Sequence, residues 1–220
     1  MKNSGWTLFL DRDGVINRRL IGTYVKRWED FEFTHRALEA ISIFGNYFDT
    51  IVVVTNQQCI GKGELTANEL NLIHSNMKEK IEKAGGFINK VYYCPNLKKE
   101  NAPCRKPNPG MGWQAKRDFP KINFQEAIMV GDSFSDMEFG WQLGTKTIFI
   151  EGKEEETERT RQIPVDGRFE NLKEVLKHYE NPARANPELT NHLAKPILFT
   201  QNQKADLLSF LLTLNDSAFV

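Results

Sequence analysis

This chain of 220 residues has few cysteines, no net charge and no long apolar run. Three cysteines are too few for a disulfide framework and are typical of a reducing compartment. The 29 basic and 29 acidic residues cancel, which argues against a nucleic-acid or membrane-surface binder. No apolar run approaches the roughly 18 residues of a membrane helix, and the first residues lack the apolar segment of a signal peptide. We therefore expect a cytoplasmic protein that binds neither membranes nor nucleic acid.

The most informative stretch is a short apolar run that ends in two aspartates. Residues 8–10 are Leu-Phe-Leu, and Asp11, Arg12, Asp13 and Gly14 follow directly. An unbroken apolar run suits a strand buried on both faces of a parallel sheet. Because side chains alternate along a strand, we expect Asp11 and Asp13 to point one way and Arg12 the other. Two adjacent carboxylates repel each other unless a cation lies between them or one holds a proton, so they indicate a reactive site. The alternative is a solvated turn with ordinary surface aspartates.

Strand patterns alternate with helical patterns through most of the chain. Further strands are predicted at 50–54, 91–93, 127–130 and 147–150, and helices at 35–44, 67–84, 109–115, 134–143 and 172–179. This alternation predicts an α/β fold with a doubly wound parallel sheet. The aromatic-rich residues 15–33 are expected to form either a flap over a pocket or a packed connector.

The composition changes near residue 181. Prolines are spaced through the next polar segment, and an amphipathic pattern with four leucines begins near residue 200. We therefore expect one domain over residues 1–180 and a helical extension over residues 181–220. The leucine face of that extension is a candidate surface for self-association or for a partner. A remnant of a gene fusion is the alternative.

Polar residues follow three of the predicted strands. Asp11 and Asp13 follow the first strand, Thr55 and Asn56 the second, and Asp132 the fourth. Active sites of doubly wound sheets lie at the carboxyl ends of the strands, so these residues are expected to meet in one crevice. A few carboxylates with several retained waters is the usual way in which proteins hold Mg²⁺. The predicted ligands are Asp11, Asp132 and, through its carbonyl, Asp13.

A phosphate ester in this crevice would meet the groups that phosphoryl transfer requires. Asp11 could attack phosphorus as a carboxylate nucleophile and form an aspartyl-phosphate. Asp13 could protonate the leaving oxygen and later deprotonate the attacking water, provided that Asp11 is ionised while Asp13 can hold a proton. The Thr55 hydroxyl, the Asn56 amide and the Lys106 ammonium would surround the transferring group.

Four segments resemble, in order, the four motifs of haloacid-dehalogenase-like (HAD-like) phosphatases. They are residues 11–17, 53–57, 104–107 and 129–132, with Asp136 as an accompanying acid. The resemblance implies a Mg²⁺-dependent phosphatase of Rossmann-like fold with minimal cap loops. It implies Asp11 as the nucleophile and Asp13 as the acid and base. The other implied site residues are Thr55, Asn56, Arg105 and Lys106 for the substrate, and Asp11, Asp13 and Asp132 for the metal.

Residues 92–95, 105–107 and 109–111 resemble one branch of that family. The branch contains D-glycero-D-manno-heptose 1,7-bisphosphate phosphatases and the histidinol-phosphatase domain. The resemblance implies a small phosphorylated metabolite as substrate. The lead candidate is the heptose bisphosphate, which would lose its 7-phosphate, and histidinol phosphate is the rival. An alternative of another class is a non-catalytic phosphatase-like scaffold, although a scaffold gains little from keeping a self-repelling cluster of carboxylates.

The chain departs from the structural zinc pattern of this branch. Cys94 and Cys104 remain, but Asn96 and Ala102 stand where the branch has a histidine and a third cysteine. Asparagine is a poor zinc ligand and alanine is none, so a closed four-ligand site cannot form. We expect no zinc and two buried or loop thiols instead.

Other departures concern single residues. Ser133 stands where heptose phosphatases have a lysine, and Cys59 stands where the family loop has a glycine. The histidines fit no catalytic triad and are expected at the surface or at helix ends: His35, His74, His178 and His192. The three glutamates at 154–156 are expected to form a solvated loop.

Overall fold

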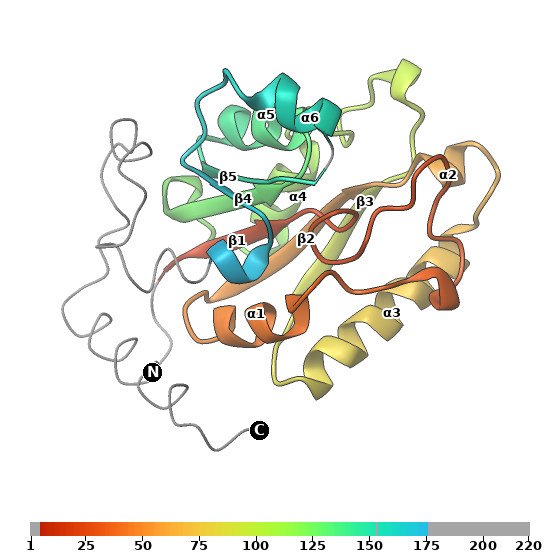
Figure 1. Cartoon of the computed structure of the whole chain (residues 1–220), viewed down its shortest axis with the longest axis horizontal. Helices are drawn as coiled ribbons and strands as arrows, with labels where there is room; N and C mark the ends of the chain where they lie inside the picture. The colour runs from red at the N-terminus through yellow and green to blue at the C-terminus, as the bar shows by residue number, and fades with distance from the viewer. Residues whose placement is uncertain (1–4, 153, 176–220) are drawn as a thin grey trace.

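The computed structural model of the chain describes residues 5–152 and 154–175 (Figure 1). Within them, parallel strands form one six-stranded sheet in the order β3-β2-β1-β4-β5-β6. The strands are β1 Thr7–Leu10, β2 Thr50–Asn56, β3 Lys90–Cys94, β4 Ala127–Gly131, β5 Lys146–Ile150 and β6 Gly167–Phe169. The order reverses at β1, which lies between β2 and β4, as in a doubly wound sheet. The predicted fold class is confirmed.

Helices cover both faces of the sheet, which explains the unbroken apolar strand sequences. Helices α1 (Ala37–Phe44) and α3 (Ala67–Lys83) lie on one side, whereas α4 (Gly110–Asp118) and α5 (Phe134–Leu143) lie on the other (Figure 1). Leu8 and Leu10 pack into the first layer and Phe9 into the second, because side chains alternate along β1. The shorter elements are α2 Gln58–Gly61, α6 Glu154–Thr160, η1 Trp28–Asp30, η2 Lys98–Glu100 and η3 Phe124–Glu126.

The structure corrects the expected loop at residues 154–156. These glutamates begin α6, and the Glu156 carboxylate accepts a 2.9 Å hydrogen bond from the backbone N–H of Phe134, the first residue of α5. A carboxylate stabilises a helix N-terminus because the first N–H groups there have no partner within the helix. The edge strand β6 and the four-residue α2 are also absent from the sequence-based prediction, since both are too short to show a period.

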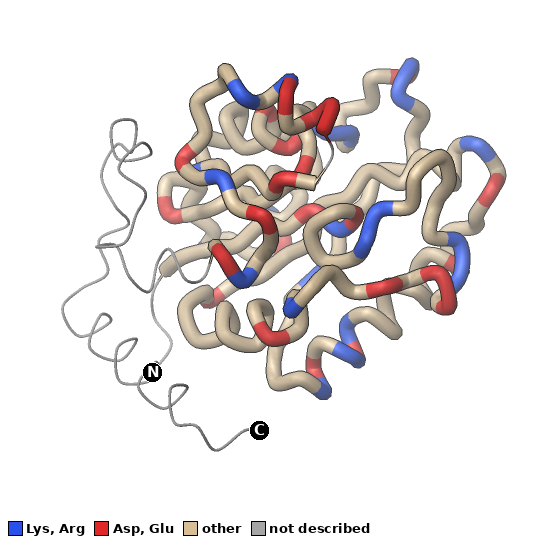
Figure 2. Tube along the Cα trace, in the orientation of Figure 1, with Lys and Arg blue, Asp and Glu red and all other residues tan. Residues whose placement is uncertain are grey.

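Part of the predicted chain organisation lies outside the described residues. A helical turn begins at Leu172, where the Asn171 side chain accepts hydrogen bonds from Lys173 N and Glu174 N. The predicted end of this helix and the whole extension over residues 181–220 fall outside the described ranges. Within those ranges no helix is both long enough and apolar enough to cross a membrane. Acidic and basic residues are interleaved along the described chain (Figure 2).

His74 on α3 is buried, contrary to the expected surface position. Arg12 Nη1 lies 3.2 Å from His74 Nε2, and both side chains are almost fully covered. The guanidinium can only donate, so the imidazole accepts and is neutral. Burial and then the charge of Arg12 lower the pKa of His74 to about 3.

This environment predicts a specific loss of stability in acid. Because the folded-state pKa of His74 lies below its unfolded value, the unfolded state alone binds a proton as the pH falls below about 6.5. The free energy of unfolding should therefore fall by about 1.4 kcal/mol per pH unit through this group. In His74→Gln, whose amide oxygen can still accept from Arg12, this contribution to the pH dependence of the free energy of unfolding should disappear between about pH 6.5 and 5. Urea titrations at several pH values measure the free energy of unfolding, and the variant His35→Gln, at an exposed histidine, is the control. An unchanged slope in His74→Gln would contradict the assignment.

Candidate active site

A pocket of about 510 Å³ lies at the carboxyl edge of the sheet. Asp11 directly follows β1, and its backbone N–H donates to Val130 O of β4 at 2.9 Å. Asp132 directly follows β4, and Thr55 and Asn56 end β2. The polar ends of the three strands therefore meet at one place, as their spacing predicts.

Lys106 is the central cation of the pocket floor. Its ammonium lies 2.8 Å from Asp11 Oδ1, 2.6 Å from Asp136 Oδ1 and 2.7 Å from the carbonyl oxygen of Val54. Burial alone would lower the pKa of Lys106, but Asp11 and Asp136 raise it above its ordinary value. Lys106 is therefore a fixed positive charge that donates hydrogen bonds to Asp11 and Val54 and forms an ion pair with Asp136.

Asp13 is held by donors on several sides. Its carboxylate accepts from Arg12 Nη2 at 2.8 Å, Asn17 Nδ2 at 3.0 Å and Gln57 Nε2 at 2.8 Å. Burial alone would raise the pKa of Asp13, but the charge and hydrogen bonds of Arg12 and the amide of Asn17 lower it below its ordinary value.

Three buried carboxylates form an acidic cradle beside Lys106: Asp11, Asp132 and Asp136. One oxygen from each lies within 4.8 Å of the others. Gly14 makes room for the cradle, since a Cβ at this position would lie 1.9 Å from Asp132 Oδ2, and the φ of +100° also favours glycine. Burial, and then the neighbouring acids, raise the pKa of Asp132 to about 7 despite an opposing arginine.

That arginine is Arg19, which the sequence analysis did not select. Its Nε and Nη2 atoms lie 2.9 and 2.5 Å from the two carboxylate oxygens of Asp132. Nη2 also donates to the carbonyl oxygen of Asp13 at 2.7 Å and lies 3.6 Å from Asp11 Oδ2. The guanidinium thus contacts the three groups that the sequence analysis selects as metal ligands. The oxygen atoms of these groups are hard ligands of the kind that suits Mg²⁺. In the structure the Arg19 guanidinium contacts the same oxygens.

Comparisons with known proteins agree with this geometry. The family model described as HAD-hydrolase-like matches residues 103–175. A D-glycero-α-D-manno-heptose-1,7-bisphosphate 7-phosphatase of Mycobacterium bovis is 40% identical over 133 residues, which cover 60% of this chain and 70% of the relative. A protein of the same name from Campylobacter jejuni is 35% identical over 176 residues, covering 79% of this chain and 95% of the relative.

A solved structure shows the same architecture. The D,D-heptose 1,7-bisphosphate phosphatase of B. bronchiseptica, complexed with magnesium and phosphate, aligns with a TM-score of 0.71 and 27% sequence identity. The alignment covers 79% of this chain and 99% of that one. This chain belongs to the family of HAD-like phosphatases.

The directions of the two pKa shifts in this HAD-like phosphatase are the reverse of the expected pair. Burial raises the pKa of Asp11, and Asp136 acts in the same direction while Lys106 opposes it. Asp13, in contrast, is favoured as the charged form. Without substrate or metal, therefore, the pKa shifts favour a protonated Asp11 and an ionised Asp13, whereas the mechanism needs the opposite.

The residues at the end of β2 are already partnered. The Thr55 hydroxyl accepts from Gln57 Nε2 at 2.9 Å. The Asn56 side chain donates to Lys106 O and accepts from Lys106 N, both at 3.0 Å. Asn56 therefore positions the Lys106 peptide, and its predicted contact with the substrate stays a prediction.

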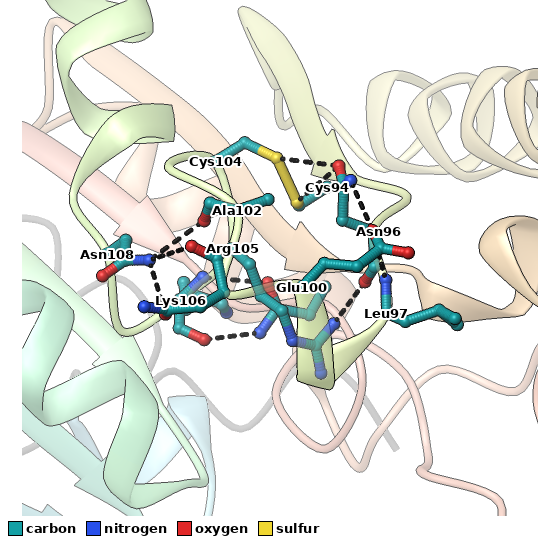
Figure 3. Close-up of a disulfide and its surroundings, with 11 residues drawn as sticks. Cys94, Asn96, Leu97, Glu100, Ala102, Cys104, Arg105, Lys106 and Asn108 are labelled. Atoms are coloured by element: carbon teal, nitrogen blue, oxygen red, sulfur yellow. Dashed lines mark hydrogen bonds between the residues drawn. A yellow bond between two sulfur atoms is a disulfide. The ribbon is translucent and has the colours of Figure 1, made fainter.

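A disulfide lies at the base of the loop that carries Arg105 and Lys106 (Figure 3). It joins Cys94, the last residue of β3, to Cys104, whereas the sequence analysis expected free thiols. The carbonyl oxygen of Asn96 accepts a 3.0 Å hydrogen bond from Arg105 Nη1 in the same loop. In the disulfide neither sulfur is a thiolate ligand, and the expected absence of zinc stays a prediction. With two of the three cysteines joined, their small number no longer supports a reducing compartment.

Sequence reasoning missed four partners of the predicted residues. Arg12, Asn17 and Gln57 lie inside segments that resemble family motifs, so their positions beside the aspartates were an available signal. No signal in the sequence singles out Arg19, because Arg18 next to it has the same chemistry. In the structure the Arg18 side chain faces solvent and is 69% exposed. Asp136, expected as a supporting residue, contacts Lys106 and also accepts from Ser133 N and Oγ.

Proposed function

We propose that this chain is a Mg²⁺-dependent phosphomonoester hydrolase that acts through an aspartyl-phosphate on Asp11. The observation that carries the proposal is the placement of Asp11 between a fixed cation, Lys106, and the other two acids of the cradle at an open pocket. The carboxylate lies 2.8 Å from Lys106, and the pocket gives a phosphate ester access to it. Lys106 offsets the negative charge that would otherwise repel an anionic substrate from a carboxylate nucleophile.

The reaction consists of two displacements at phosphorus. In the first, an Asp11 oxygen bonds to phosphorus, the ester P–O bond breaks, and Asp13 gives its proton to the leaving alcohol oxygen. In the second, Asp13 takes a proton from water, whose oxygen attacks phosphorus and releases phosphate and Asp11. The arriving phosphate dianion raises the pKa of Asp13, because a nearby negative charge favours the protonated form. The dianion acts on Asp11 in the same direction, so an ionised Asp11 beside a protonated Asp13 also requires the positive charge of a bound metal ion next to Asp11.

The remaining site residues bind or orient. Asp11, Asp132 and the carbonyl of Asp13 would hold Mg²⁺, which, when bound, keeps Asp11 ionised and neutralises charge on the phosphoryl oxygens. Lys106 and the Thr55 hydroxyl bind the phosphoryl group, while Asn56 holds the Lys106 peptide in place.

The proposed substrate is D-glycero-α-D-manno-heptose 1,7-bisphosphate, which loses its 7-phosphate. The relatives of that name support this choice, as does the distribution of positive charge in the pocket. Beyond Lys106 at the floor, Arg105 and Lys62 also line the pocket. A substrate with two phosphates can place one at Asp11 while the other meets these basic groups. Ser133 supplies no charge, so the second phosphate depends more strongly on Arg105.

We propose in addition that residues 1–180 form the catalytic domain. Residues 181–220 are then an extension that catalysis does not require.

The roles of the two aspartates predict different responses to the leaving group. Asp11→Asn should lower kcat by about a thousandfold or more on every ester, because an amide is a poor nucleophile. Asp13→Asn should lower kcat by about a hundredfold or more on the sugar phosphate, but by much less on p-nitrophenyl phosphate, whose leaving group hardly needs a proton. Steady-state kinetics with circular dichroism as a folding control would measure both. Equal losses of Asp13→Asn on the two esters would remove Asp13 from the acid role.

Substrate choice is tested by comparing a bisphosphate with monophosphates. The kcat/KM should be highest for the heptose 1,7-bisphosphate, and lower for its β anomer, heptose 7-phosphate and histidinol phosphate. Arg105→Ala should lower kcat/KM about tenfold for the bisphosphate and change it little for heptose 7-phosphate, because only the former has the second anion. Lys99→Ala, an exposed residue of the same loop, is the matched control. A higher kcat/KM for histidinol phosphate, or equal losses on both heptose esters, would contradict this assignment.

A further inference from the structure

Arg19 already contacts the groups that are proposed to bind the metal ion. Its two contacts with Asp132 are bidentate, at 2.9 and 2.5 Å, and the same Nη2 reaches the Asp13 carbonyl at 2.7 Å. Guanidinium is charged at every physiological pH and can only donate, so these contacts need an anion or a carbonyl opposite them. The arrangement gives the acidic cradle a positive partner that comes from the chain itself.

The backbone explains why this arginine, and not its neighbour, points inward. Asn17 pairs with Phe33, and Arg18 N donates to Glu32 O, so the segment is extended where it leaves the site. Consecutive side chains of an extended segment face opposite sides. Arg18 consequently faces solvent, where it pairs with Glu32 at 3.2 Å, and Arg19 faces the cradle.

A guanidinium and a divalent cation cannot both occupy this cradle. Both would use the oxygens of Asp132 and the carbonyl of Asp13, and their charges repel each other at this distance. The acids also cannot remain charged without a partner, because three buried carboxylates raise one another's energy.

We propose that Arg19 is the internal counter-cation of the metal cradle, and that Mg²⁺ binds by displacing its guanidinium. The inference rests on the Mg²⁺ site of the proposed function. Arg19 stabilises the metal-free fold and at the same time lowers the affinity for Mg²⁺. The displaced side chain has a place to go, since it is 31% exposed and already lines the 510 Å³ pocket.

Binding of Mg²⁺ to the full chain without substrate tests this inference directly. Calorimetric titration should give a Kd for Arg19→Gln about tenfold or more below that of the wild type, because the competing cation is gone. In EDTA, the melting temperature of Arg19→Gln should be lower than that of the wild type, and added Mg²⁺ should raise it by more. Arg18→Gln, which removes the same charge one residue away, should match the wild type in both measurements.

The possible results separate this inference from the metal site itself. If the wild type and Arg19→Gln bind Mg²⁺ equally, or if the variant binds more weakly, Arg19 does not compete and the inference is wrong. If neither binds, the proposed metal site is wrong and the inference falls with it. If Arg19→Gln does not fold, Arg19→Met takes its place, because methionine keeps a long flexible side chain without the positive charge. An unchanged Kd in Arg19→Met would then overturn the inference.

Discussion

The structure depends on the compensation of buried negative charge. Three aspartates, Asp11, Asp13 and Asp132, follow two adjacent central strands, β1 and β4, and Asp136 lies beside them in the first turn of α5. Burial alone would drive the first three toward their neutral forms. Positive groups oppose this: Lys106 lies between Asp11 and Asp136, Arg12 pairs with Asp13, and Arg19 pairs with Asp132. Removing one partner of such a cluster leaves an uncompensated buried charge, which costs several kcal/mol. The cluster therefore links the stability of the fold to the chemistry of the site.

The fold supplies the geometry that this compensation needs. Because β1 and β4 are neighbours in register, Asp11 and Asp132 emerge side by side at the switch point of the sheet. The loop after β3 brings Lys106 back over β2, where the Asn56 side chain holds both polar groups of its peptide. Gly14 leaves space for the Asp132 carboxylate where any other residue would clash. The sheet and the loops anchored to it thus fix the positions of the charged groups relative to one another.

The sequence predicts the sheet and the acids for a physical reason. Strands that are buried on both faces appear in the sequence as unbroken apolar runs, so they can be predicted locally. Because the strands are parallel, aspartates that follow them must lie at the carboxyl edge of the sheet. Features that depend on contacts distant in sequence have no local signal. The pairing of Cys94 with Cys104, the burial of His74 under Arg12 and the contact of Glu156 with the first residue of α5 all arise from the tertiary arrangement. Arg19 is the clearest case, since only the pairing of its segment with residues 32 and 33 distinguishes it from Arg18.

The central claim is that Asp11 carries the phosphoryl group during turnover. The most direct measurement is an acid quench during turnover of an aryl phosphate, followed by borohydride reduction and peptide mass spectrometry. Reduction converts an aspartyl-phosphate to homoserine, and the account predicts homoserine at position 11. It should accumulate in Asp13→Asn, where the second displacement lacks its base. Product formation without homoserine at position 11, or with homoserine at position 13 or 132 instead, would contradict the account.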